Sequence, residues 1–303
     1  MAYLAFDMDG TIGSFTVLKR LLCIFNQPAF FIKTPEKIAA LRPDLEKIIA
    51  VSYRKFISAI LAKEHSGTPL GLFRPGIFDL FKKINQLRQT GLIKGVLIYS
   101  NNLTESLVTF VKDVINLAVG TSVIDASFFR YSQDRLNKSG HGNPEKTWAE
   151  LKQLLMAIGA PETILPNEAI FFDDLVHANL KKNLGTNYIN VEEYIHNAPL
   201  IDILEVYRKA LIDDNKEFEV NQKAILTYIK SCSYDADYNT VNDYLTAILS
   251  AKAKGEYKIK GTGPIPANDK RAAKYMSASL NAILGKSGGG SRKTRRHRRR
   301  TNL

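Results

Sequence analysis

The chain has 303 residues, of which 45% are hydrophobic, and a formal net charge of +12 at pH 7. This length and composition indicate a globular protein with one large domain and appendages. No apolar stretch approaches the roughly 20 residues of a membrane-spanning helix, and no signal pattern opens the chain. We therefore expect an intracellular protein, cytoplasmic or nuclear, without membrane contact. Cys23 and Cys232 match no metal-binding spacing, so we expect free thiols.

Short apolar runs alternate with helical patterns through the first part of the chain. The apolar runs predict strands at residues 3–6, 94–99, within 123–129, 169–172 and 187–191. The helical patterns cover most of 16–65, the segments that follow Gly76 and Asn102, and residues 144–155. This alternation predicts an α/β fold over residues 1–195, built as a three-layer, Rossmann-like parallel sheet.

The remaining segments are predicted to be appendages of that domain. Residues 16–72 form a helical insert within it, and residues 196–255 form a helical extension after it. Residues 256–290 contain a linker and a short helix, which either docks on the body or remains mobile. Residues 291–303 form a basic tail that we expect to be disordered, because it cannot form a core.

The sequence Asp7-Met8-Asp9-Gly10-Thr11 follows the first predicted strand directly. It places two carboxylates at the carboxyl end of a strand, where open α/β sheets bind ligands. One carboxylate can attack an electrophile while the other handles a proton, and together they form a hard oxygen site for Mg²⁺. This pattern indicates phosphoryl transfer through an aspartyl-phosphate. The alternative is an Asp-Gly turn without chemistry.

Three further polar groups follow later elements of the predicted sheet. Ser100 and Asn101 come after the second strand, and Asp173 and Asp174 end a later one; the alternative for these residues is a turn or a helix N-cap. Lys146, at the start of the helix predicted over 144–155, can neutralise a phosphoryl group, with Lys138 as its rival. Most lysines are simply solvated surface charge.

In their order along the chain, these four groups resemble the motifs of the haloacid dehalogenase-like hydrolases. The resemblance implies that Asp7 is the nucleophile and Asp9 the general acid and base. It implies that Ser100 and Lys146 hold the phosphoryl oxygens, with Gly10, Thr11 and Asn101 as further substrate contacts. It also implies that Mg²⁺ is bound by four residues: Asp7, Asp9 (through its carbonyl), Asp173 and Asp174.

The sequence Phe171-Phe172-Asp173-Asp174, with Asn179 after it, looks most like the capless magnesium-dependent phosphatases and the polymerase C-terminal-domain phosphatases of that superfamily. The insert at 16–72 departs from them and resembles a small cap, which in this superfamily favours small substrates over phosphoproteins. His141 and His177 lie near the motifs, and we expect both to be surface residues without a catalytic role.

The expected function is therefore hydrolysis of a phosphate monoester, on a small molecule or a macromolecule. The alternative is a hydrolase-like scaffold that binds nucleic acid or a protein through its tail and C-terminal helices. A third reading is a phosphatase acting on nucleic-acid ends. Residues 287–303 carry seven Lys and Arg residues and no acid, which suits phosphate backbones or a nuclear localisation signal. This tail is similar to those of large-DNA-virus proteins, which suggests a viral origin and a place in the virion.

Overall fold

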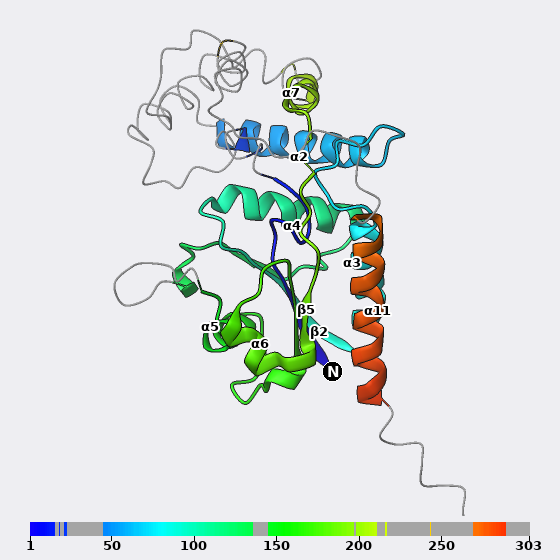
Figure 1. Cartoon of the computed structure of the whole chain (residues 1–303). Coiled ribbons are helices and arrows are strands. Elements are labelled where there is room, and N and C mark those ends of the chain that lie inside the picture. Colours follow the sequence, from blue (N-terminus) through cyan, green and yellow to red (C-terminus); the bar gives the residue numbers. More distant parts are fainter. Residues whose placement is uncertain are drawn as a thin grey trace, which may run out of the picture.

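A computed structural model of the chain describes residues 1–15, 45–135, 145–196, 198–210 and 269–288, with the isolated positions 18, 21, 22, 216 and 243 (Figure 1). Five strands form its centre: β1 (Ala2–Phe6), β2 (Ile93–Tyr99), β3 (Ala126–Phe128), β4 (Ala169–Asp173) and β5 (Tyr188–Asn190). The longer helices are α2 (Leu45–Glu64), α3 (Ile77–Gln89), α4 (Glu105–Val119), α5 (Trp148–Ala157), α6 (Ala178–Leu184), α7 (Leu200–Arg208) and α11 (Asp269–Gly288). Short 3-10 turns occupy Gln133–Arg135, Pro166–Glu168 and Gly185–Asn187.

The strands form one sheet in the order β3-β2-β1-β4-β5, and every pairing is parallel. The central strand β1 pairs with β2 on one side and with β4 on the other. The chain fills one side of β1 with β2 and β3, and then crosses to the other side for β4 and β5. The order therefore reverses beside β1, and this is the place where sheets of this kind form a crevice for ligands.

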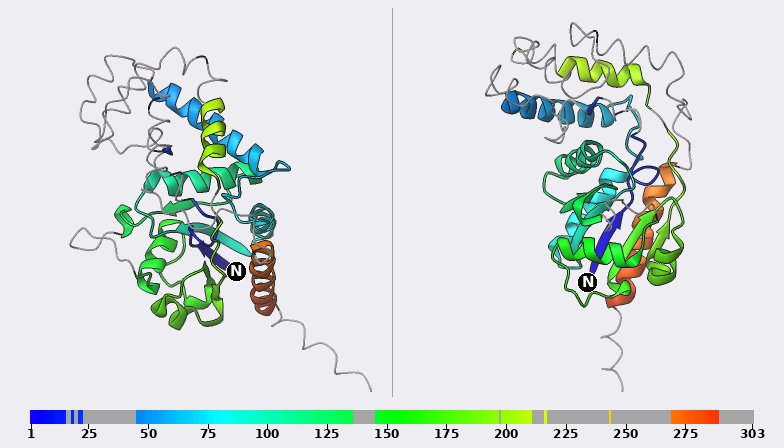
Figure 2. Two further views of the ribbon diagram at one scale, coloured as in Figure 1. Left: turned by 45° about the horizontal axis from the view of Figure 1, so that its top comes forward. Right: turned by 90° about the vertical axis from the view of Figure 1, so that its left-hand side faces the viewer.

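Helices cover both faces of the sheet, which gives three layers (Figures 1 and 2). Side chains alternate along β1, so that Leu4 and Phe6 join the core beneath α3 and α4. Ala5 points to the opposite face and joins the core beneath α5 and α6. Phe6 stacks on Phe172 of β4 at 4.5 Å between ring centroids, which ties the two central strands together. The α/β, Rossmann-like prediction is thus confirmed.

The described part of the predicted insert, α2, packs on the outer side of α4 and also contacts α7 (Figure 2). Tyr53 donates a hydrogen bond to Asp113 of α4 at 2.9 Å, and Phe56 packs against Phe110 and Tyr207. Residues 23–44 of the insert lie outside the described residues, so the cap over the site stays a prediction.

The C-terminal helix α11 lies against α3 in both views (Figures 1 and 2). Met276 and Leu280 of α11 are fully buried in the core beside α3. Lys83 of α3 donates to the Ser277 hydroxyl at 2.7 Å. Of the two alternatives that the sequence left open, docking on the body is therefore the one observed.

All five predicted strands are confirmed, but the helix predicted over 144–155 begins at Trp148. Thr147 is its N-cap, because the Thr147 hydroxyl accepts from the Glu150 backbone N–H at 3.2 Å. Lys146 therefore precedes the helix. Among the residues described, no helix combines the length and apolar character that crossing a membrane requires. Other predictions fall on residues outside the described ranges: Cys23, Lys138, His141, Cys232, most of 196–255 and the tail 291–303.

Candidate active site

The predicted site residues meet at the carboxyl ends of β1, β2 and β4, at the point where the strand order reverses. Asp7 follows β1, Ser100 follows β2, and Asp173 is the last residue of β4. Because these three strands are adjacent and parallel, their carboxyl ends meet at one edge of the sheet. Topology thus brings together groups that lie far apart in the sequence.

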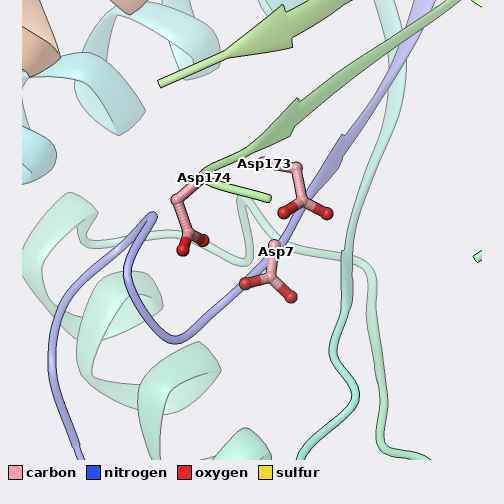
Figure 3. A group of neighbouring side chains, drawn as sticks. All are labelled: Asp7, Asp173 and Asp174. Atoms are coloured by element: carbon pink, nitrogen blue, oxygen red, sulfur yellow. The ribbon is translucent and has the colours of Figure 1, made fainter. Parts of the chain in front are cut away.

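Three carboxylates surround a common space at this edge (Figure 3). Asp7, Asp173 and Asp174 each offer an oxygen, and these oxygens all lie within 4.8 Å of one another. Thr11 fixes the third member, since its hydroxyl donates to Asp174 Oδ1 at 3.0 Å and accepts from the Asp174 backbone N–H at 2.9 Å. The side chain of Asp9 lies outside this group, and a role for the Asp9 carbonyl stays a prediction.

Burial raises the pKa values of all the acids at the site. It raises the pKa of Asp7 to about 6 and that of Asp9 to about 6. Burial, with the charges of Asp7 and Asp173, raises the pKa of Asp174 to about 7. Burial also raises the pKa of Asp173. Such a group of carboxylates is costly to ionise without a compensating cation, because like charges held close together in a desolvated site repel one another.

Lys146 supplies one positive charge between two of these carboxylates. It is buried, and its ammonium donates to Asp7 Oδ1 and, at 2.8 Å, to Asp173 Oδ2. Burial alone would lower the pKa of Lys146, but the charges of Asp7 and Asp173 raise it further than burial lowers it. The ammonium is therefore charged and lies against Asp7 and Asp173, while its predicted part in neutralising a phosphoryl group stays a prediction.

Asp9 is held by a residue that the sequence analysis did not select. Asn102 donates from its side-chain amide to Asp9 Oδ2 at 3.0 Å. The other oxygen, Oδ1, is buried and finds no hydrogen-bond partner among the described residues. Asn102 directly follows the predicted residues Ser100 and Asn101, so extending that motif by one residue would have included Asn102.

Ser100 is buried at the site, and its hydroxyl accepts from the Asn102 backbone N–H at 3.0 Å. A hydroxyl that accepts one bond can still donate its own proton, so Ser100 can bind a ligand oxygen. The helix α4 begins only at Glu105, which excludes Ser100 as its N-cap. The Asn101 side chain is turned to Arg135, which donates to Asn101 Oδ1 at 2.8 Å.

Gly10 adopts a conformation that favours glycine and lies directly against Asp174. Its φ is +78°, and a Cβ atom placed there would lie 2.4 Å from an Asp174 carboxylate oxygen. The Gly10 carbonyl accepts from the Tyr194 backbone N–H at 2.8 Å and from the buried Arg74 guanidinium. Gly10 therefore contributes through its backbone, which shapes the loop that carries Asp9 and Thr11.

His177 contradicts the expectation of a surface residue. It is buried beside Lys146, whose backbone N–H donates to His177 Nδ1 at 3.4 Å. Its Nε2 lies 3.4 Å from Asp173 Oδ2. Burial and the Lys146 charge lower the pKa of His177, so the ring is neutral near pH 7. The turn between β4 and α6 creates this burial, which depends on tertiary contacts with the Lys146 segment.

A cavity of about 390 Å³ opens onto these groups. Its lining includes every predicted catalytic residue, namely Asp7, Asp9, Ser100 and Lys146. The other lining residues are Asn101, Asn102, His177, Leu103, Leu107 and Leu175. A larger hollow beside α2 contains none of these acids. The small cavity is therefore the place where a substrate could meet the carboxylates.

The residues present fit a divalent cation such as Mg²⁺. Carboxylate oxygens are the ligands this ion prefers, and three of them converge here at an energetic cost that a cation would offset. Comparisons of the chain with protein-family models, with curated proteins and with solved structures found no match.

Proposed function

We propose that the protein is a Mg²⁺-dependent phosphohydrolase of the haloacid dehalogenase-like type, which cleaves a phosphate monoester through an aspartyl-phosphate. One observation carries the proposal: residues from four separate segments meet at one place. Asp7, Asp9, Ser100 and Lys146 line one cavity, and Asp173 and Asp174 lie beside Asp7 in one group of carboxylates. The resemblance assigned each of these residues a part in one reaction. If these residues only formed turns or helix caps, nothing would require them to lie close together.

In the first half of the proposed reaction, a carboxylate oxygen of Asp7 attacks phosphorus and the bond to the leaving oxygen breaks. Asp9 donates the proton that the leaving oxygen takes up. A pKa of about 6 suits Asp9 to this task, because it can carry a proton near neutral pH and release it again. Lys146 and Ser100 bind the phosphoryl oxygens and stabilise their charge.

In the second half, water attacks the phosphorus of the aspartyl-phosphate and gives its proton to Asp9. The bond between phosphorus and Asp7 breaks, which releases inorganic phosphate and restores the Asp7 carboxylate and the protonated Asp9. Asp7, Asp173 and Asp174 would hold Mg²⁺, with the Asp9 carbonyl as a further ligand by resemblance. When bound, the ion supplies positive charge that neutralises the phosphoryl group and orients it for in-line attack.

The test is hydrolysis of an aryl phosphate by the full chain, with Mg²⁺ and with a chelator. We expect turnover that needs the metal and falls by at least about 10³-fold in Asp7→Asn, because the amide is not a nucleophile. The control is Asp79→Asn, an exposed acid in the first turn of α3, which should leave turnover unchanged.

Circular dichroism and urea unfolding would establish that Asp7→Asn is folded. Turnover that persists in a folded Asp7→Asn protein would contradict the assignment of the nucleophile. Turnover that the chelator leaves unchanged would contradict the role of the metal. The nucleic-acid partner of residues 291–303 and the viral origin stay predictions, because nothing in the described residues bears on them.

A further inference from the structure

The mouth of the candidate active site exposes apolar side chains that the proposed chemistry does not use. Leu103 and Leu175 line the cavity, with exposed fractions of 47% and 59%. Val176, next to Leu175, is 55% exposed. Leu107 also lines the cavity and is fully buried, so the apolar surface continues inward from the rim. Apolar surface left in water at a cavity mouth is typical of a place that a ligand covers.

The topology of the sheet places the two leucines on opposite sides of the nucleophile. Leu103 follows β2 and Leu175 follows β4, and these are the two strands that flank β1. Asp7 follows β1, between them. A phosphate group attacked by Asp7 would therefore carry its organic part outward between the two leucines.

The charges of the cavity limit that organic part further. Lys146 is the only lysine or arginine among the described residues that line the cavity, and Asp7 and Asp173 already share its charge. The described lining offers no second cation for another phosphate or a carboxylate.

We infer that the substrate is a phosphate monoester with a single phosphate and an apolar organic group, which packs between Leu103 and Leu175. This inference rests on the proposed function and narrows it. Sugar and polyol phosphates would leave these leucines against hydroxyl groups, which prefer water. Within the described lining, a second anionic group of the substrate would have no lysine or arginine as a partner.

The test compares 2-phenylethyl phosphate with glycerol 1-phosphate on the full chain with Mg²⁺. Both are primary alkyl phosphates with one phosphate, so their intrinsic reactivities are similar and kcat/KM reports recognition. We expect at least a 10-fold preference for 2-phenylethyl phosphate, on the order of the discrimination that apolar contacts provide. Leu175→Asn and Leu103→Asn should each reduce that preference about 3- to 10-fold, chiefly through KM.

Leu165→Asn is the matched control, because Leu165 is 56% exposed but lies before β4, at the opposite end of the strand from the cavity. It should leave the preference unchanged. Hydrolysis without a preference, or with a preference that both cavity variants retain, would overturn the inference while leaving the proposed function standing.

Binding of the same two compounds, followed by calorimetry, keeps the two ideas separable. If neither compound is hydrolysed, the proposed function fails for these substrates, and binding decides the inference alone. Tighter binding of 2-phenylethyl phosphate that Leu175→Asn weakens would support the apolar site. Equal binding of the two compounds, or binding of neither, would overturn it.

Discussion

Lys146 is a buried charge that is stable only because of its neighbours. It lies between Asp7 and Asp173, and the rings of Tyr99 and Phe171 approach its ammonium at 5.4 and 5.2 Å. Two anions share one cation, so the local charge is negative and suits a divalent metal better than a bare phosphate. On the proposed function, a bound metal would offset this negative charge and let the acid-rich site accept an anionic substrate.

Glu64 offers a separate test of a buried acid, away from the site. It ends α2 and accepts from the Leu72 backbone N–H at 2.9 Å. Burial raises the pKa of Glu64 from its ordinary 4.5 to about 7. The folded chain therefore holds a proton there that the unfolded chain releases, so this contribution to stability is full below pH 4.5 and is lost as the pH rises through 7.

We expect Glu64→Gln to reduce the fall in unfolding free energy between pH 4.5 and 7 by roughly 1–2 kcal/mol, since the amide cannot ionise. Urea unfolding at a series of pH values measures it. Glu162→Gln, at an exposed position, is the control and should keep the wild-type slope. An identical slope in Glu64→Gln would show that Glu64 is not held in a desolvated place.

The segment that follows β2 is held in place by a buried ion pair from two later elements. Arg135, in the 3-10 turn Gln133–Arg135, donates to the Ser100 carbonyl and to Asn101, and pairs with Glu150 of α5 at 2.7 Å. Its guanidinium also stacks on Tyr99 at 4.6 Å. Since Glu150 lies just after Lys146, this network links the Ser100 segment to the lysine segment.

Arg135→Lys keeps the positive charge but loses the planar guanidinium, which donates to Ser100, Asn101 and Glu150 at the same time. We expect unfolding free energy to fall by about 2–4 kcal/mol, because a buried carboxylate loses part of its pairing. In protein that is still folded, we expect kcat/KM to fall about 10- to 100-fold through misplacement of Ser100. Urea unfolding and steady-state kinetics on one preparation measure both.

Arg88→Lys is the matched control. Arg88 makes a similar two-pronged bond to Asp125, but the pair is partly exposed and lies outside the cavity lining. Arg88→Lys should lower the unfolding free energy by less than about 1 kcal/mol and leave kcat/KM unchanged. A folded Arg135→Lys protein with wild-type kcat/KM would limit the network to a purely structural role.

Sequence reasoning succeeded where local pattern and sheet topology suffice. Asp7, Asp173 and Ser100 each follow an apolar run, and parallel strands bring such positions together. It failed where placement depends on tertiary contacts, as with Arg135, which lies in a polar loop sequence, and His177, which was expected at the surface. The start of α5 is different: Thr147 and Glu150 form a T-x-x-E capping pattern that could have placed it correctly.

The molecule as a whole is the three-layer body with α2 and α7 stacked beyond α4, and α11 along α3 (Figures 1 and 2). Neither α11 nor α3 contributes to the cavity lining among the described residues. The helix α11 closes the outer face of α3 and fixes the end of the described chain to the body.

Leu280→Ala tests that role, since Leu280 is fully buried in the core against α3. We expect a loss of about 2–4 kcal/mol in unfolding free energy, from lost apolar burial and a residual cavity. Tyr275→Ala, at a 52% exposed position of the same helix, should cost well under 1 kcal/mol. Because α11 lies away from the carboxylates, folded Leu280→Ala protein should keep the wild-type kcat/KM. A negligible loss of stability in Leu280→Ala would mean that α11 does not dock on the body, and that the core ends at α3.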